Sequence, residues 1–127
     1  MNAAACRTFP ASVRLKKRRE YLEVYDRGVR VAGSHIVLFV LPTERGGPRL
    51  GVTATRRVGA AVRRNRARRV IREVFRHHRH RLPAWDLVVN VRRSAPFRSY
   101  RRLEQDFLNL VGRAEKRLSY VRTGESP

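Results

Sequence analysis

Arginine is concentrated in one stretch of this 127-residue chain, where its spacing suits the binding of phosphate groups. Residues 56–81 contain eleven arginines and a single acidic residue, Glu73. On a helix, arginines three or four positions apart are neighbours, and each like-charged pair destabilises the helix by about 0.2–0.5 kcal/mol. Because a guanidinium can bind phosphate through paired hydrogen bonds, this pattern predicts a helix that lies against nucleic acid. One predicted row comprises Arg64, Arg68, Arg72 and Arg76, and the neighbouring row comprises Asn65, Arg69 and Arg72.

The charge of the whole chain indicates the same class of partner. Thirty lysines and arginines against ten aspartates and glutamates give a formal net charge of +20, and a field of this sign attracts polyanions. The alternatives are a solvated charged face and a basic helix that lies on anionic lipid. Charges of one sign argue against the first, and an apolar stripe that the protein core requires argues against the second. We therefore expect a nucleic-acid partner and no membrane.

Aromatic residues are a second candidate feature for binding RNA. Tyr21 and Tyr25 share one face of a predicted helix, and Phe39 lies in a predicted strand with Val37 on the same side. Stacking of an unpaired base on an exposed aromatic ring contributes about 1–3 kcal/mol. Packing of these rings into the hydrophobic core is the alternative, and the sequence leaves it open.

Residues for catalysis or metal binding are not grouped in any local motif. The acidic residues are spread along the chain, whereas a two-metal nuclease needs several carboxylates around paired ions. We expect His77, His78 and His80 to extend the solvated basic helix rather than to bind a metal. Cys6 has no evident base partner and is a poor candidate nucleophile. The sequence therefore predicts a binding protein with no catalytic residue and no metal-binding residue of its own.

Hydrophobic periodicity predicts three helices and three strands. Apolar residues within 67–75 and 103–118 recur at the spacing of a helix with one buried face. A turn rich in glycine and proline separates the first two strands, and we expect these strands to form a hairpin. The predicted order is helix 16–27, strand 35–41, strand 49–55, a helix from Ala60 that ends before Pro83, strand 86–91 and helix 99–118. This order predicts an α+β domain in which helices pack on one mixed sheet.

The length of the chain predicts one folded domain. We place this domain at 14–118, between a flexible N-terminal arm (1–13) and a C-terminal tail (119–127). The single cysteine leaves no internal disulfide, and no apolar run reaches the roughly 18 residues that a membrane-spanning helix needs. We therefore expect a cytoplasmic protein.

The string RRVGAAVRRNRARRVIREVFR at 56–76 resembles the signature of the bacterial ribonuclease P protein component. The resemblance extends over 14–118 and includes Arg14-Leu15, the spaced aromatics Tyr21 and Tyr25, and the strand segments. The two helix aromatics are usually phenylalanine in that family. Their hydroxyls in this chain leave stacking possible and could alter the preference for a leader sequence.

The resemblance implies a fold and a reaction. The fold is a small α/β sandwich with a left-handed crossover through the basic helix. A version with one further short strand is an alternative. The reaction is the Mg²⁺-dependent removal of the 5′ leader from precursor tRNA, in which a catalytic RNA subunit holds the ion and no stable protein partner is evident. The implied RNA-binding residues are Arg56, Arg57, Arg64, Asn65, Arg66, Arg68, Arg69, Arg72 and Arg76, and the implied leader cleft comprises Tyr21, Tyr25, Val37 and Phe39. A ribosomal or RNA-chaperone protein and a protein-only nuclease are the competing hypotheses.

Overall fold

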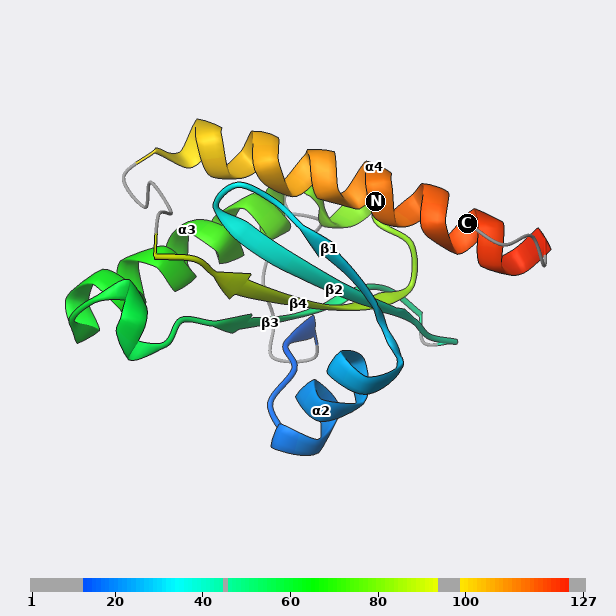
Figure 1. The fold of residues 1–127 in the computed structure, drawn as a ribbon, viewed down its shortest axis with the longest axis horizontal. Helices are drawn as coiled ribbons and strands as arrows, with labels where there is room; N and C mark the ends of the chain where they lie inside the picture. Colours follow the sequence, from blue (N-terminus) through cyan, green and yellow to red (C-terminus); the bar gives the residue numbers. More distant parts are fainter. Residues whose placement is uncertain (1–12, 45, 94–98, 124–127) are drawn as a thin grey trace.

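A four-stranded sheet separates two unequal helical layers in the computed structural model, which describes residues 13–44, 46–93 and 99–123 (Figure 1). Helices α3 and α4 pack on one face of the sheet, and α2 packs on the other. The predicted arm lies outside the described residues except for Val13, which is buried in the core. In chain order the elements are α2 (Arg18–Arg27), β1 (Val29–Ala32), β2 (Ile36–Pro42), β3 (Arg49–Thr53), the 3-10 turn η2 (Arg56–Val58), α3 (Ala61–His78), the 3-10 turn η3 (Arg79–Arg81), β4 (Trp85–Val91) and α4 (Tyr100–Thr123).

The strands are arranged in the order β1-β2-β4-β3. β2 pairs antiparallel with β1 and with β4, whereas β3 pairs parallel with β4. The predicted hairpin between strands 35–41 and 49–55 is therefore wrong, because β4 lies between the corresponding strands β2 and β3. The hairpin instead joins β2 to β1, a short strand in addition to the three predicted ones.

The central place of β4 explains this order. All of its side chains except that of Asn90 are buried, which is typical of a strand covered on both faces. The connection between β2 and β3 spans the end of β4, where the Thr43 N–H donates to the Ala84 carbonyl at 2.8 Å. A local turn signal can indicate that the chain reverses, but it cannot show that a later strand will enter the gap.

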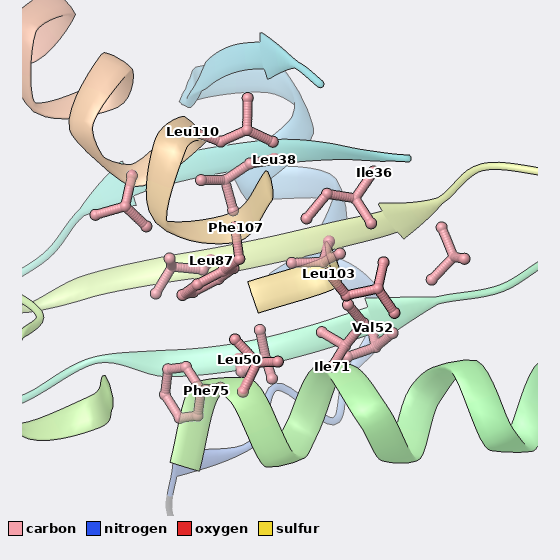
Figure 2. Packing of buried hydrophobic residues seen from close by; sticks show 14 of the residues in the cluster. Ile36, Leu38, Leu50, Val52, Ile71, Phe75, Leu87, Leu103, Phe107 and Leu110 are labelled. Atoms are coloured by element: carbon pink, nitrogen blue, oxygen red, sulfur yellow. The ribbon is translucent and has the colours of Figure 1, made fainter. Parts of the chain in front are cut away.

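The main core lies between the sheet and the layer of α3 and α4 (Figure 2). Ile36 and Leu38 of β2 and Leu87 of β4 contribute from the sheet, and all three are fully buried. The helical stripes predicted from periodicity are confirmed, because their apolar residues form the helical side of this core. These residues are Ala67, Ile71, Val74 and Phe75 of α3, and Leu103, Phe107, Leu110, Val111 and Ala114 of α4.

The α+β class, the mixed sheet and the three helices are confirmed. α4 runs to Thr123, five residues beyond its predicted end at Leu118. Gly28 ends α2 as expected, and its N–H donates to the Val24 carbonyl at 2.9 Å. Its φ of −82° shows that close packing, rather than a left-handed turn, requires glycine there: a Cβ would lie 2.4 Å from the Val24 carbonyl oxygen. The left-handed sense of the β3–α3–β4 crossover stays a prediction.

Candidate nucleic-acid interface

Helix α3 directs its arginines away from the core. Its apolar stripe is buried against the sheet and α4, so helical geometry turns the remaining faces outward. Glu73 is the only acidic residue in 61–78, so carboxylates of the helix itself offset one of its positive charges. Of the predicted RNA-binding residues, Arg56, Arg57, Asn65, Arg66, Arg69 and Arg72 are exposed, and Arg64, Arg68 and Arg76 are half-buried.

An open groove of about 430 Å³ follows this helix, and we call it the α3 groove. Arg14 contributes to it because the segment before α2 pairs with the outer edge of β3, where the Leu15 N–H donates to the Leu50 carbonyl at 2.9 Å. Desolvation lowers the pKa of Arg72, and the nearby charges of Arg14 and Arg68 lower it further. Positive charge therefore accumulates in the groove. Its lining residues are Arg14, Asn65, Arg68, Arg69, Arg72, Glu73 and Arg76.

Two arginines of the groove are held by contacts within the protein. Arg68 donates to Asn65 Oδ1 at 3.1 Å and to the Ala54 carbonyl at 3.3 Å. Arg76 forms an ion pair with Glu73. These contacts orient the two guanidiniums before any ligand arrives, and such preorganisation lowers the entropy lost on binding.

The predicted aromatic residues lie together on the opposite face of the sheet, beside α2, and we call this surface the aromatic face. The rings of Tyr25 and Phe39 meet edge to face, with centroids 4.7 Å apart. Tyr21, Tyr25 and Phe39 are half-buried around a small cluster of Leu15, Val24 and Val88, whereas Val37 is buried (8 % exposed). The rings therefore pack in a core and also keep part of their surface accessible.

The aromatic face and the α3 groove meet at the edge strand β3. Tyr21 lies against Gly51 of β3, and its hydroxyl donates to the Leu15 carbonyl at 3.3 Å. Burial raises the pKa of Tyr21, while the charge of Arg72 in the groove acts in the opposite direction. The tyrosine rings of the aromatic face and the guanidiniums of the α3 groove therefore lie close together across β3.

A partly buried ion cluster, which no sequence motif indicates, anchors α2 on the sheet. Arg49 donates to both carboxylate oxygens of Asp86, at 2.9 and 2.8 Å, and to Glu20 Oε2 at 2.8 Å. The other oxygen of Glu20 accepts from the N–H groups of Lys16 and Lys17. The hydrogen bond from Lys17 is the main cause that lowers the pKa of Glu20. These residues come from α2, β3 and β4, so no local spacing could have grouped them.

A second basic depression, of about 1310 Å³, lies where the parallel strands β3 and β4 end, and we call it the arginine basin. Arg56 and Arg57 line it, so the predicted RNA-binding residues lie at two sites, except for Arg64 and Arg66, which line neither. Arg92 and Arg93 were missed in the sequence, although the rule that ligands bind at the carboxyl ends of parallel strands could have identified them. Gly59, whose φ of +139° favours glycine, allows the chain to turn from the basin into α3. The basin is lined by Thr53, Thr55, Arg56, Arg57, Val58, Gly59, Arg63, Asn90, Val91, Arg92 and Arg93.

The histidines at the end of α3 connect it to α4, so their prediction as a solvated extension is wrong for two of them. His77 Nδ1 lies 2.6 Å from the Tyr100 hydroxyl, and His78 Nε2 lies 2.8 Å from Glu104 Oε2. Both imidazoles are half-buried, whereas His80 is exposed. The reason is that the start of α4 packs against this end of α3, which brings Tyr100 and Glu104 to the histidines. Burial, followed by the charge of Glu104, raises the pKa of Tyr100 to about 12.

The described residues do not provide a donor set for a divalent metal ion. Within 13–44, 46–93 and 99–123, no group of three or more histidine, cysteine or carboxylate side chains is arranged to hold one. Several acidic residues instead make structural contacts: Glu20 and Asp86 bind Arg49, and Asp106 accepts from the N–H groups of His35 and Ile36. In the same described ranges, no helix has both the length and the apolar character needed to cross a bilayer.

Comparison with known proteins agrees with these features. The family model for ribonuclease P matches residues 9–115. The ribonuclease P protein component of Chlamydia pneumoniae is 36% identical over 112 residues, which cover 87% of this chain and 81% of that protein. The same component of Pelotomaculum thermopropionicum is 39% identical over 102 residues, or 80% of this chain and 91% of that protein.

Solved structures show the same architecture. The RNase P protein of Staphylococcus aureus superposes with a TM-score of 0.73 at 27% identity, covering 80% of this chain and 94% of that one. The RNase P protein of Thermotoga maritima superposes with a TM-score of 0.71 at 28% identity, covering 79% of this chain and 96% of that one.

Proposed function

This chain belongs to the ribonuclease P protein family, whose members are subunits of an endoribonuclease complex, and from this we propose a division of its surface between two RNAs. The α3 groove and the arginine basin bind the catalytic RNA subunit, and the aromatic face binds the 5′ leader of precursor tRNA. The complex then removes the leader by Mg²⁺-dependent hydrolysis of one phosphodiester. The observation that carries this proposal is the meeting of the α3 groove and the aromatic face at β3.

The grip on RNA comes from guanidinium groups that a phosphate backbone neutralises. The exposed residues Arg69 and Arg72 lie in the groove beside the oriented Arg68, and Arg56 and Arg57 lie in the basin. Burial is the first cause that lowers the pKa of Arg72, and bound phosphates would offset the second, which is repulsion by Arg14 and Arg68. Phosphate binding would also release counterions, so affinity should fall steeply as salt concentration rises.

The leader is held by stacking rather than by charge alone. The accessible surfaces of Tyr21, Tyr25 and Phe39 suit unpaired bases, because every base has a π-face. Anchoring of α2 through Arg49 holds the two tyrosines at a set height above the sheet. Val37 is largely buried, and its role is to provide an apolar surface beneath the stacked bases.

Catalysis is assigned to the RNA subunit. This chain lacks a donor set for Mg²⁺ in its described residues, and the carboxylates of Glu20, Asp86 and Asp106 stabilise the fold. The contribution of the protein is to hold the substrate and the catalytic RNA together. The translational and rotational entropy of the two RNAs is therefore lost on binding, before the chemical step, and this lowers the barrier of that step.

A cleavage assay with three arms tests the proposal. Precursor tRNA is incubated at low Mg²⁺ with the protein alone, with the catalytic RNA alone, and with both. We expect efficient cleavage at the mature 5′ end only when both are present. Cleavage by the protein alone would indicate a protein-only nuclease. No effect of the protein on cleavage by the RNA would indicate an RNA-chaperone or ribosomal role.

A further inference from the structure

Three polar side chains meet at one border of the aromatic face. Thr53 of β3 and Asn90 of β4 are opposite each other in the parallel register. The hydroxyl of Tyr25, reaching down from α2, lies 2.8 Å from Asn90 Oδ1 and 3.4 Å from Thr53 Oγ1. Phe39 packs edge to face with the Tyr25 ring and helps to fix the position of this hydroxyl.

The direction of the hydrogen bonds follows from the protons available. A tyrosine hydroxyl has one proton, and the shorter contact, to Asn90 Oδ1, uses it. Thr53 must therefore donate its own proton to the Tyr25 oxygen. The resulting chain runs from Thr53 through Tyr25 to Asn90. It holds the amide with its oxygen toward Tyr25 and its NH₂ group turned away.

The amide NH₂ of Asn90 lies between the two kinds of RNA contact. Asn90 and Thr53 both line the arginine basin, and Asn90 pairs with Val37 on its other side. Asn90 is half-buried, its Oδ1 accepts from Tyr25, and none of the described residues accepts a hydrogen bond from its NH₂ group. Two oriented donors thus stand beside rings that can stack bases and arginines that can bind phosphates.

We propose that Asn90 is a specificity-determining residue, which donates from its amide NH₂ to an acceptor atom on the edge of one unpaired leader base. Tyr25 and Thr53 are positioning residues that keep the amide in this orientation. The inference rests on the proposed binding of the leader to the aromatic face. A fixed donor favours a base with a ring nitrogen or carbonyl oxygen at that point and disfavours one with an amino group there.

The alternative is that Asn90 and Thr53 only satisfy a half-buried tyrosine hydroxyl. In that case, removing the hydroxyl would change stability and would leave the relative affinities for different bases unchanged. Base preference therefore separates the two roles, whereas affinity for a single substrate does not.

The test uses the complete holoenzyme and precursor tRNAs in which each leader position carries A, C, G or U in turn. With the natural protein we expect one position at which the best and worst bases differ in Kd by about three- to tenfold, the range for one hydrogen bond. Tyr25→Phe keeps the ring but frees the amide to turn over, and should reduce that difference to less than twofold. Asn90→Leu should do the same, and the double variant should reduce it no further.

Base analogues make the test specific to the acceptor atom. A preferred purine that is replaced by its 7-deaza or 3-deaza form should lose the preference with the natural protein. The same replacement should have no effect with Asn90→Leu. No base preference at any leader position, an unchanged preference in Tyr25→Phe, or an equal loss from the analogues in Asn90→Leu would each overturn the proposal.

Tyr21→Ala distinguishes failure of this inference from failure of the proposed function. It should weaken binding of precursor tRNA more than binding of mature tRNA if the leader lies on the aromatic face. If Tyr21→Ala has this effect while Tyr25→Phe leaves base preference unchanged, the role of Asn90 is wrong and leader binding stands. If Tyr21→Ala weakens both substrates equally, both are wrong. Thermal unfolding of each variant verifies that it is folded.

Discussion

The ring of Tyr21 occupies the space directly over Gly51. A Cβ atom built on Gly51 would lie 2.6 Å from Cζ of Tyr21 and 2.7 Å from its hydroxyl oxygen. The tyrosine that links the aromatic face to the α3 groove is therefore seated where β3 has no side chain. The distance between α2 and the sheet therefore depends on the lack of a side chain at Gly51 and on the ion cluster around Arg49.

Gly51→Ala should displace Tyr21. Because the added methyl group overlaps the ring, we expect a loss of about 1–3 kcal/mol in the free energy of unfolding and weaker binding of precursor tRNA. Urea denaturation and a leader-dependent binding assay measure the two effects. Gly112→Ala is the control, since nothing lies within 4 Å of its Cβ on the exposed side of α4, and alanine there should stabilise the helix. Equal effects of the two substitutions would contradict the assigned packing.

Arg69→Gln should weaken binding of the catalytic RNA without destabilising the protein. The substitution removes one exposed guanidinium from the groove and relieves repulsion along α3, so the free protein should be at least as stable as before. The slope of log affinity against log salt should fall in magnitude by nearly one, and cleavage should need more Mg²⁺. Arg27→Gln makes the same charge change at an exposed position paired with Glu23 on α2. If both variants shift the salt slope alike, the α3 groove has no special role.

Removing Arg49 should be far more damaging than removing an exposed arginine. Arg49→Met breaks the ion pair with the buried carboxylate of Asp86, and breaking such a pair from one side typically costs about 3–5 kcal/mol. The double variant Arg49→Met with Asp86→Leu should recover most of this loss, because apolar side chains then replace both members of the ion pair. Urea denaturation at neutral pH measures both. A loss below about 1 kcal/mol for the single variant would show that the cluster does not anchor α2.

Stability should decline in alkaline solution through Tyr100. Its pKa is raised from an ordinary value of 10.0 to about 12, so the folded protein retains a proton that the unfolded chain releases. The free energy of unfolding should therefore be constant below about pH 10 and fall as the pH rises toward 12. Tyr100→Phe should flatten this part of the profile. Denaturation series from pH 8 to 11.5 provide the measurement, and parallel profiles for the two proteins would contradict the assignment.

Periodicity within single segments predicted much of the fold. The helices, the buried stripe from Ala67 to Phe75 and the outward arginine rows all follow from the angle between successive residues on a helix. The strand at 86–91 was also predicted, whereas its burial on both faces was found only in the structure. The hairpin prediction failed because strand order depends on which strand is covered on both faces, and a turn motif carries no information about that.

The candidate site was predictable where its residues are adjacent in the chain. The motif at 56–76 and the aromatic spacing of α2 were visible in the sequence. The contacts of His77 and His78 with α4 were not, because their partners follow more than 20 residues later. The arginine basin likewise joins residues that are distant in the chain, because Arg92 and Arg93 follow β4 whereas Arg56 and Arg57 follow β3.

The sequence by itself determined that this protein carries an arginine-covered helix, because net charge and helical spacing are properties of the chain that no packing arrangement alters. Only the tertiary structure decided that Tyr25, Thr53 and Asn90 share hydrogen bonds and that Tyr21 lies over Gly51. The physical reason is that such contacts join α2, β3 and β4, whose relative positions are set by burying both faces of the sheet at once. Periodicity shows which face of a single helix or strand is buried, but it does not show how several elements pack together.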